Sequence, residues 1–113
     1  MDPYKSKGER IIVAFLQNRG FKFIYEHPFL IKDEFGKKRI WYPDFYLPDL
    51  SIIIEFFGME NDPNYDISVE KIREAYKKSK IDLIELNPKI LKGDWRNYVT
   101  IAITSILMKR LDK

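Results

Sequence analysis

The segment 51–57 constrains the fold more than any other part of this sequence. It reads Ser-Ile-Ile-Ile-Glu-Phe-Phe, an almost continuous apolar run that ends at Gly58. Such a run is typical of a central strand that is buried on both faces of a sheet. The segment therefore predicts a covered central strand, and the carboxylate of Glu55 is out of place within it.

The other segments predict helices and further strands around this one. In chain order the patterns predict a helix over residues 9–19, a strand over 21–31, a return strand over 39–46, the central strand, a helix beginning at Asp62 and Pro63, a strand over 81–86 and a final helix capped by Asp94. Pro43 lacks a backbone N–H and predicts an edge or a bulge in the return strand. The order α-β-β-β-α-β-α predicts an α/β or α+β fold, with a mixed central sheet flanked by helices in one domain over residues 1–113.

The composition excludes several kinds of chemistry. The 113 residues contain no cysteine and one histidine, which excludes disulfide scaffolds, thiol catalysis and zinc sites built from cysteines or several histidines. A net charge of +3 permits binding to a polyanion without requiring it. The sequence contains no run of about 18 apolar residues and no signal-peptide pattern at its start. We expect an intracellular, cytoplasmic protein with no membrane partner, whose chemistry uses carboxylates, lysines and hydroxyls.

Two acidic residues are predicted to face each other in one hairpin. If the turn is centred between Asp49 and Leu50, then Asp44 and Glu55 lie at equal distances from it and pair across the two strands. Directly opposed residues have Cβ atoms about 4.5–5.5 Å apart, and two like charges there are destabilising. A divalent cation would compensate them, because Mg²⁺ binds one or two carboxylates and substrate phosphate. The alternative is an ordinary surface hairpin, since a register slip of one residue would send the two side chains to opposite faces.

The residues around this pair resemble a known family. Residues 42–49, Tyr-Pro-Asp-Phe-Tyr-Leu-Pro-Asp, followed by residues 53–58, Ile-Ile-Glu-Phe-Phe-Gly, are similar to the motifs of the PD-(D/E)XK nuclease superfamily. The likeness is nearest to the branch with very short patch repair endonucleases and helicase-associated nuclease modules, and it covers roughly residues 6–91. It implies a restriction-endonuclease-like αβββαβ core with an extra C-terminal helix.

The resemblance assigns roles to particular residues. Asp44 and Glu55 match the two metal-binding acids, and the carbonyl of Phe56 matches a backbone metal ligand. Glu9 matches an acid that many members carry on the first helix. It has a structural alternative, because Ser6 and Glu9 also have the spacing of a helix capping box. The implied cofactor is Mg²⁺, with Mn²⁺ as a substitute.

The sequence departs from the family motif at one position. The usual lysine two residues after the second acid is Phe57 here. Some members take this cation from the following helix, which directs attention to Lys71 and Arg73. Helical geometry places Arg73 nearer the buried face, but lysine is the more common choice, so Lys71 is the candidate catalytic cation.

The expected function is metal-dependent hydrolysis of phosphodiester bonds in DNA. Little chain lies outside the predicted core, so the cleavage is expected to be structure-selective, as in repair, recombination or replication, rather than sequence-specific. Cutting both strands of a duplex would require a homodimer, and a larger helicase or repair complex is a further expected partner. The loss of the usual lysine motivates an alternative from another class, a non-catalytic nucleic-acid-binding or subunit module on a decayed nuclease fold.

Overall fold

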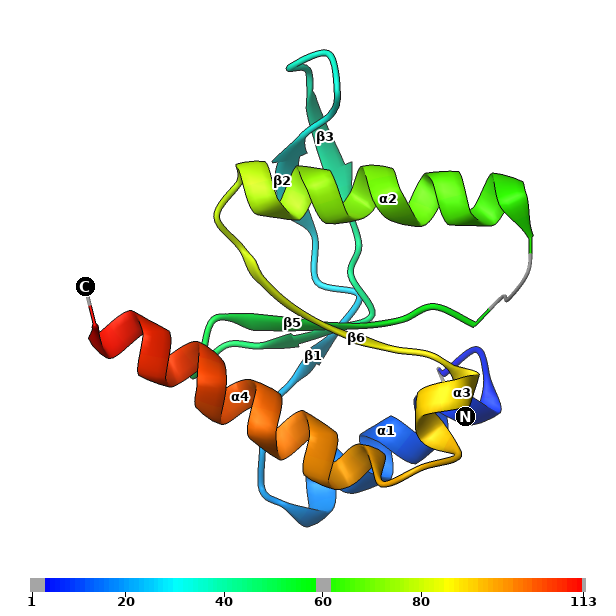
Figure 1. Ribbon diagram of the computed structural model, residues 1–113, viewed down its shortest axis with the longest axis vertical. Helices are drawn as coiled ribbons and strands as arrows, with labels where there is room; N and C mark the ends of the chain where they lie inside the picture. The colour runs from blue at the N-terminus through cyan, green and yellow to red at the C-terminus, as the bar shows by residue number, and fades with distance from the viewer. Residues whose placement is uncertain (1–3, 59–61, 113) are drawn as a thin grey trace.

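The apolar segment forms an interior strand of a mixed sheet, as predicted. A computed structural model describes residues 4–58 and 62–112 of the chain (Figure 1). Its elements in chain order are α1 (Lys7–Asn18), β1 (Ile24–Tyr25), β2 (Phe29–Lys32), β3 (Lys38–Trp41), β4 (Phe45–Leu47), β5 (Ile52–Phe56), α2 (Pro63–Lys78), β6 (Asp82–Leu86), α3 (Pro88–Leu91) and α4 (Trp95–Leu111). The main sheet has the order β1-β4-β5-β6, in which β5 and β6 are parallel and the other neighbours antiparallel.

Alternate residues of β5 enter two separate cores. Ile52 and Ile54 are fully buried with residues of α1 and α4, whereas Ile53 is buried with residues of α2. Figure 1 shows the same layers, with α1 and α4 on one side of the sheet and α2 on the other. A strand with apolar residues on both faces can occupy this position because helices cover both faces. The prediction of a mixed sheet flanked by helices is confirmed.

The two long strands predicted before β5 are each broken, so this part of the prediction was wrong. The first divides into β1 and β2 at Glu26, whose backbone φ is +53°, and at Pro28, which follows shortly after. The second divides into β3 and β4 around the buried Pro43. Proline cannot donate to a strand ladder, and a positive φ bends the chain. As a result, β2 and β3 form their own two-stranded sheet, which stands away from the main sheet in Figure 1.

The pairing of β4 with β5 has the predicted register. Phe45 lies opposite Ile54, and Leu47 lies opposite Ile52. The ladder stops at Phe45, so Asp44 and Glu55 are the next opposed positions beyond its end. The predicted pair is thus placed one position beyond the last backbone pair of the two strands.

Helices α1 and α2 begin at side-chain caps, whereas α4 begins after Asp94, as predicted, without a capping hydrogen bond from the Asp94 side chain. The Ser6 side chain accepts a hydrogen bond from the backbone N–H of Glu9 at 3.1 Å, and Asp62 caps α2 by accepting from the N–H of Asn64 at 3.0 Å. The four-residue helix α3, capped by Asn87, was not predicted. Within residues 4–58 and 62–112, none of the helices combines the length and the apolar character that crossing a membrane requires.

Candidate functional site

The carboxylates of Asp44 and Glu55, hereafter the acid pair, are held by reciprocal hydrogen bonds. The backbone N–H of Asp44 donates to Glu55 Oε1 at 2.6 Å, and the N–H of Phe56 donates to Asp44 Oδ2 at 2.6 Å. Each strand therefore provides a carboxylate and a backbone donor at the point where the regular ladder ends. Two acids from neighbouring strands are fixed side by side by this exchange.

Two neutral donors hold the other oxygen of the buried Glu55 carboxylate. Only 3% of the residue is exposed, and its Oε2 accepts hydrogen bonds from Trp41 Nε1 at 3.1 Å and Tyr76 Oη at 3.0 Å. Neither donor carries a positive charge. The orientation of this acid is set by neighbours that leave its negative charge uncompensated.

Burial and mutual repulsion make the acid pair hard to ionise. Burial, with the charge of Glu55, raises the pKa of Asp44 to about 8. Burial also raises the pKa of Glu55 above its usual range, against the lowering effect of its hydrogen bonds. Raised carboxyl pKa values of this kind mark a site that a cation would stabilise, since a positive charge favours the ionised form of both acids.

Glu9 joins the acid pair from the first turn of α1. Only 6% of it is exposed, and its Oε1 accepts hydrogen bonds from the N–H of Lys5 at 2.9 Å and from Tyr25 Oη at 2.8 Å. Its charge contributes to the raised pKa of Asp44. The capping alternative is half realised, because Ser6 caps the N–H of Glu9 whereas the Glu9 carboxylate bonds the N–H of Lys5. The structure brings the three predicted acids together.

The aromatic ring of Phe56 closes this end of the site against α1. A Cβ at position 8 would overlap the ring, so glycine there lets α1 approach β5 without displacing Phe56. The N–H of Phe56 is engaged with Asp44, and that of Phe57 donates to the carbonyl of Leu86 at 2.8 Å. The assignment of the Phe56 carbonyl as a metal ligand stays a prediction.

The acid pair opens into a cavity of about 260 Å³, hereafter the acid pocket. Its other lining residues are mainly aromatic and apolar: Trp41, Tyr42, Phe56, Phe57, Tyr65, Ser68, Val69 and Ile72. Among the described lining residues there is no lysine or arginine. Phe57, at the position of the usual family lysine, and Ile72 of α2 both face this cavity. The acid pocket therefore combines a buried and a half-buried acid with described walls that carry no positive charge.

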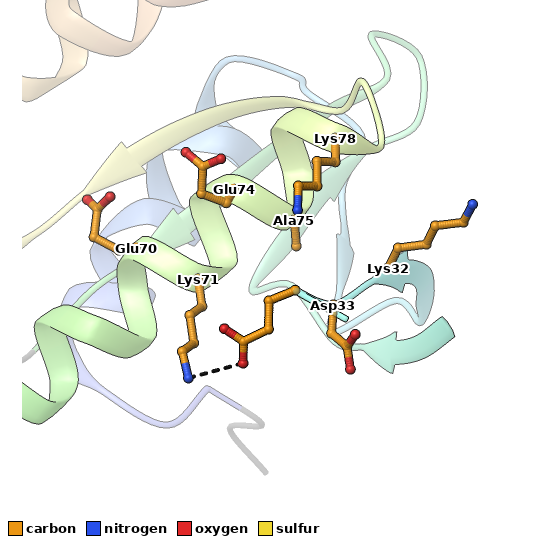
Figure 2. Close-up of a pocket in the computed structure, with 8 residues that line it drawn as sticks. Lys32, Asp33, Glu70, Lys71, Glu74, Ala75 and Lys78 are labelled. Carbon is orange, nitrogen blue, oxygen red and sulfur yellow. Dashed lines mark ion pairs between the residues drawn. The ribbon is translucent and has the colours of Figure 1, made fainter. Parts of the chain in front are cut away.

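The structure places Lys71 outside the acid pocket. Its Nζ forms an ion pair with Glu34 Oε1 at 3.3 Å, marked by the dashed line in Figure 2. The two side chains are 58% and 48% exposed. They border a separate cavity of about 200 Å³, hereafter the outer groove, lined by Lys32, Asp33, Glu34, Glu70, Lys71, Glu74, Ala75 and Lys78. Lys71 is not brought together with the predicted acids.

Arg73, the other candidate cation, is also engaged elsewhere. It donates from Nε and Nη2 to the two carboxylate oxygens of Glu85 at 2.7 and 2.6 Å, and it also pairs with Glu70. The hydrogen bonds to Glu85 raise its pKa above the ordinary value. The planar guanidinium is thus held in a two-bond arrangement on the surface of β6.

Sequence reasoning missed the groups that orient the acids. In the sequence, Tyr76 belongs to the apolar stripe of α2 and Trp41 to an aromatic strand segment. Their donors are invisible to a search for charged motifs, because tyrosine and tryptophan in apolar patterns are counted as core.

The donor set at the acid pair fits a hard divalent cation. Two carboxylates on adjacent strands supply the oxygen ligands that Mg²⁺ prefers, and the ion would complete its coordination with water and phosphate. The described residues contain no group of three or more histidine, cysteine, aspartate or glutamate side chains arranged to hold a metal ion. The assignment therefore depends on the pair and its uncompensated charge.

Comparison with known proteins identifies no relative of this chain. No family model, curated protein or solved structure matches the chain. The function is therefore inferred from the chemistry of the acid pocket.

Proposed function

We propose that this protein is a Mg²⁺-dependent endonuclease that hydrolyses phosphodiester bonds in DNA, built on a restriction-endonuclease-like core. The observation that carries the proposal is the acid pair, in which a buried Glu55 and a half-buried Asp44 share one pocket without a positive charge in its described walls. An arrangement that costs stability in the folded chain is typical of a site kept for function. The DNA substrate and the nuclease core are supported by the motif resemblance around these same residues.

Asp44, Glu55 and the carbonyl of Phe56 would hold the metal. A bound Mg²⁺ supplies an activated water and polarises the phosphate. In the hydrolysis, a bond forms between the water oxygen and phosphorus while the bond from phosphorus to the leaving sugar oxygen breaks. The leaving oxygen takes up a proton, and the products are a phosphate monoester and a hydroxyl.

The chain's own residues position this chemistry. Trp41 and Tyr76 orient Glu55 by donating to its Oε2, and the N–H of Phe56 orients Asp44. Aromatic residues of the acid pocket exclude bulk water from the acids, which strengthens their interaction with a cation. Glu9 adds a third carboxylate at the α1 side of the site.

The proposal includes a structure-selective substrate. One acid pocket of this kind is present in the part of the chain that the structure describes, so cutting both strands requires two copies or two successive events. We propose a homodimer or a larger helicase or repair complex as the acting form.

The test is cleavage of a panel of substrates with Mg²⁺ and with Mn²⁺: single strand, duplex, flap, mismatch and four-way junction. Glu55→Gln is compared with Glu34→Gln, the same chemical change on the exposed ion pair of the outer groove. We expect Glu55→Gln to lose roughly 100-fold or more of the rate and Glu34→Gln to stay within about twofold. Asp44→Ala should also abolish cleavage while nucleic-acid affinity is kept or increased. Mg²⁺-dependent cleavage by Asp44→Ala would refute the proposal.

One observation favours a second candidate function. The absence of a lysine or arginine among the described walls of the acid pocket is also what a non-catalytic nucleic-acid-binding or subunit module on the same fold would show. Metal titration separates the two candidates. A nuclease should gain thermal stability with Mg²⁺ or Mn²⁺, and Asp44→Ala should remove that gain. A decayed module should show no metal-dependent gain in the wild type.

A further inference from the structure

Hydrolysis of a phosphodiester builds negative charge on the phosphate oxygens, and the acid pocket lacks a described cation to offset it. Preorganised positive groups that meet this charge are a major source of rate in phosphoryl transfer. The following inference rests on the proposed function and addresses which residue supplies the positive charge.

Lys5 approaches the acids from the N-terminal side of α1. Its backbone N–H donates to Glu9 Oε1 at 2.9 Å, which fixes the start of its side chain next to the third carboxylate. Its Nζ bonds Glu26 Oε2 at 2.9 Å, and the N–H of Glu26 donates to the carbonyl of Asp44 at 3.1 Å. Two independent routes of direct contacts therefore connect Lys5 to the site.

The acids of the site also raise the pKa of the Lys5 ammonium. The hydrogen bond that Lys5 donates to Glu26 raises the pKa of Lys5 most, followed by the charge of Glu26, and the charges of Glu9 and Asp44 raise it further. The ammonium thus lies within the field of two of the three site acids. By contrast, the cations expected from α2 are paired with Glu34, Glu70 and Glu85, and Arg39 of β3 is paired with Asp33 at 2.9 Å.

The present partner of Lys5 is easily exchanged. The Lys5 side chain is 70% exposed and that of Glu26 is 34% exposed. Exposed ion pairs of this kind are weak, because water screens them and the long side chains lose freedom when they pair. A phosphodiester that enters beside Asp44 brings a negative charge that competes with Glu26 for the ammonium.

We propose that Lys5 is the catalytic cation of this site, and that its ammonium leaves Glu26 to contact the scissile phosphate. A lysine just ahead of α1 then takes the role that neither Phe57 nor Lys71 fills. Glu26 holds the ammonium near the site when no substrate is bound.

The test compares Lys5→Met with Lys22→Met, an exposed lysine ahead of β1, in single-turnover cleavage by the full chain. Lys5→Met retains the backbone N–H that fixes Glu9, so the acids stay oriented. We expect it to lower kcat roughly 100-fold with little change in KM, Lys5→Arg to recover part of the loss, and Lys22→Met to stay within about twofold. The thermal stabilisation by Mg²⁺ should be the same in Lys5→Met and the wild type.

Glu26→Gln separates catalysis from a structural role. If Lys5 only pairs with Glu26, the two variants will slow cleavage equally, which would overturn the inference. If Lys5 acts on the phosphate, Glu26→Gln frees the ammonium and cleaves at least as fast as the wild type. A Lys5→Met rate within threefold of the wild type would overturn the catalytic role of Lys5. It would leave the proposed function itself in place. A wild-type chain that cleaves no substrate of the panel would overturn the proposed function itself, and this inference with it.

Discussion

The acid pocket and the outer groove lie on neighbouring parts of the molecule and have similar volumes, about 260 and 200 Å³. The outer groove is rich in charges of both signs, and its ion pair between Lys71 and Glu34 is exposed to solvent. The acid pocket has two acids, one almost fully buried, without a compensating cation among its described walls. The number of charges therefore does not distinguish the proposed site from the outer groove, whereas burial of acids without a compensating cation does.

The sharpest test of this contrast uses adjacent positions of α2. Ile72 lines the acid pocket and Lys71 lines the outer groove, although both also border a further cavity with Trp41. Ile72→Lys in the Lys5→Met background should restore cleavage about tenfold or more, because the new ammonium enters beside the acids. The matched control is Ile67→Lys, the same change at a position of α2 that is 57% exposed, and it should restore nothing. Equal rates for both double variants would remove the distinction between the two regions.

The two regions should also differ in how pH affects stability. The pKa of Asp44 is about 8 in the folded chain against 3.8 ordinarily, so between these values the folded chain holds a proton that the unfolded chain has released. The free energy of unfolding should therefore decrease as pH rises through this window. Relative to Asp44→Asn, metal-free wild type should lose at least about 1.4 kcal/mol between about pH 5 and 8, measured by urea unfolding. If the free energy of unfolding depended on pH in the same way in both proteins, the raised pKa of Asp44 would be contradicted.

The smallest effect is expected in the outer groove. A double-mutant cycle with Lys71→Ala and Glu34→Ala should give a coupling energy below about 0.5 kcal/mol, since both side chains are about half exposed. The coupling should fall further in high salt, because exposed charges are screened. A coupling above about 2 kcal/mol that resists salt would show that the groove is more than a solvated surface.

Much of the site was predictable because it depends on local patterns. The turn after Leu47 fixes the register of two strands, and register alone places Asp44 opposite Glu55. The central strand and the helices follow from apolar periodicity. These are properties that neighbouring residues determine together.

The features of the site that were not predicted depend on contacts between residues that are distant in the sequence. A shift of one residue turns a helical side chain by about 100°, and this separates Lys71 in the outer groove from Ile72 in the acid pocket. The break in the first strand after Tyr25 requires a positive φ at Glu26, and no sequence pattern predicts this backbone conformation. The donors to Glu55 come from Trp41 and Tyr76, residues whose pattern indicates only burial.

The site is assembled from four separate elements: Glu9 comes from α1, Asp44 precedes β4, Glu55 lies in β5 and Tyr76 belongs to α2. Such non-local contacts form only when distant segments have already been brought together. A fragment ending before α2 would carry Asp44 and Glu55 as ordinary hydrated carboxylates without a pocket. The acid pocket is therefore a property of the assembled domain, and the ability to bind a metal there would report on complete folding of the chain.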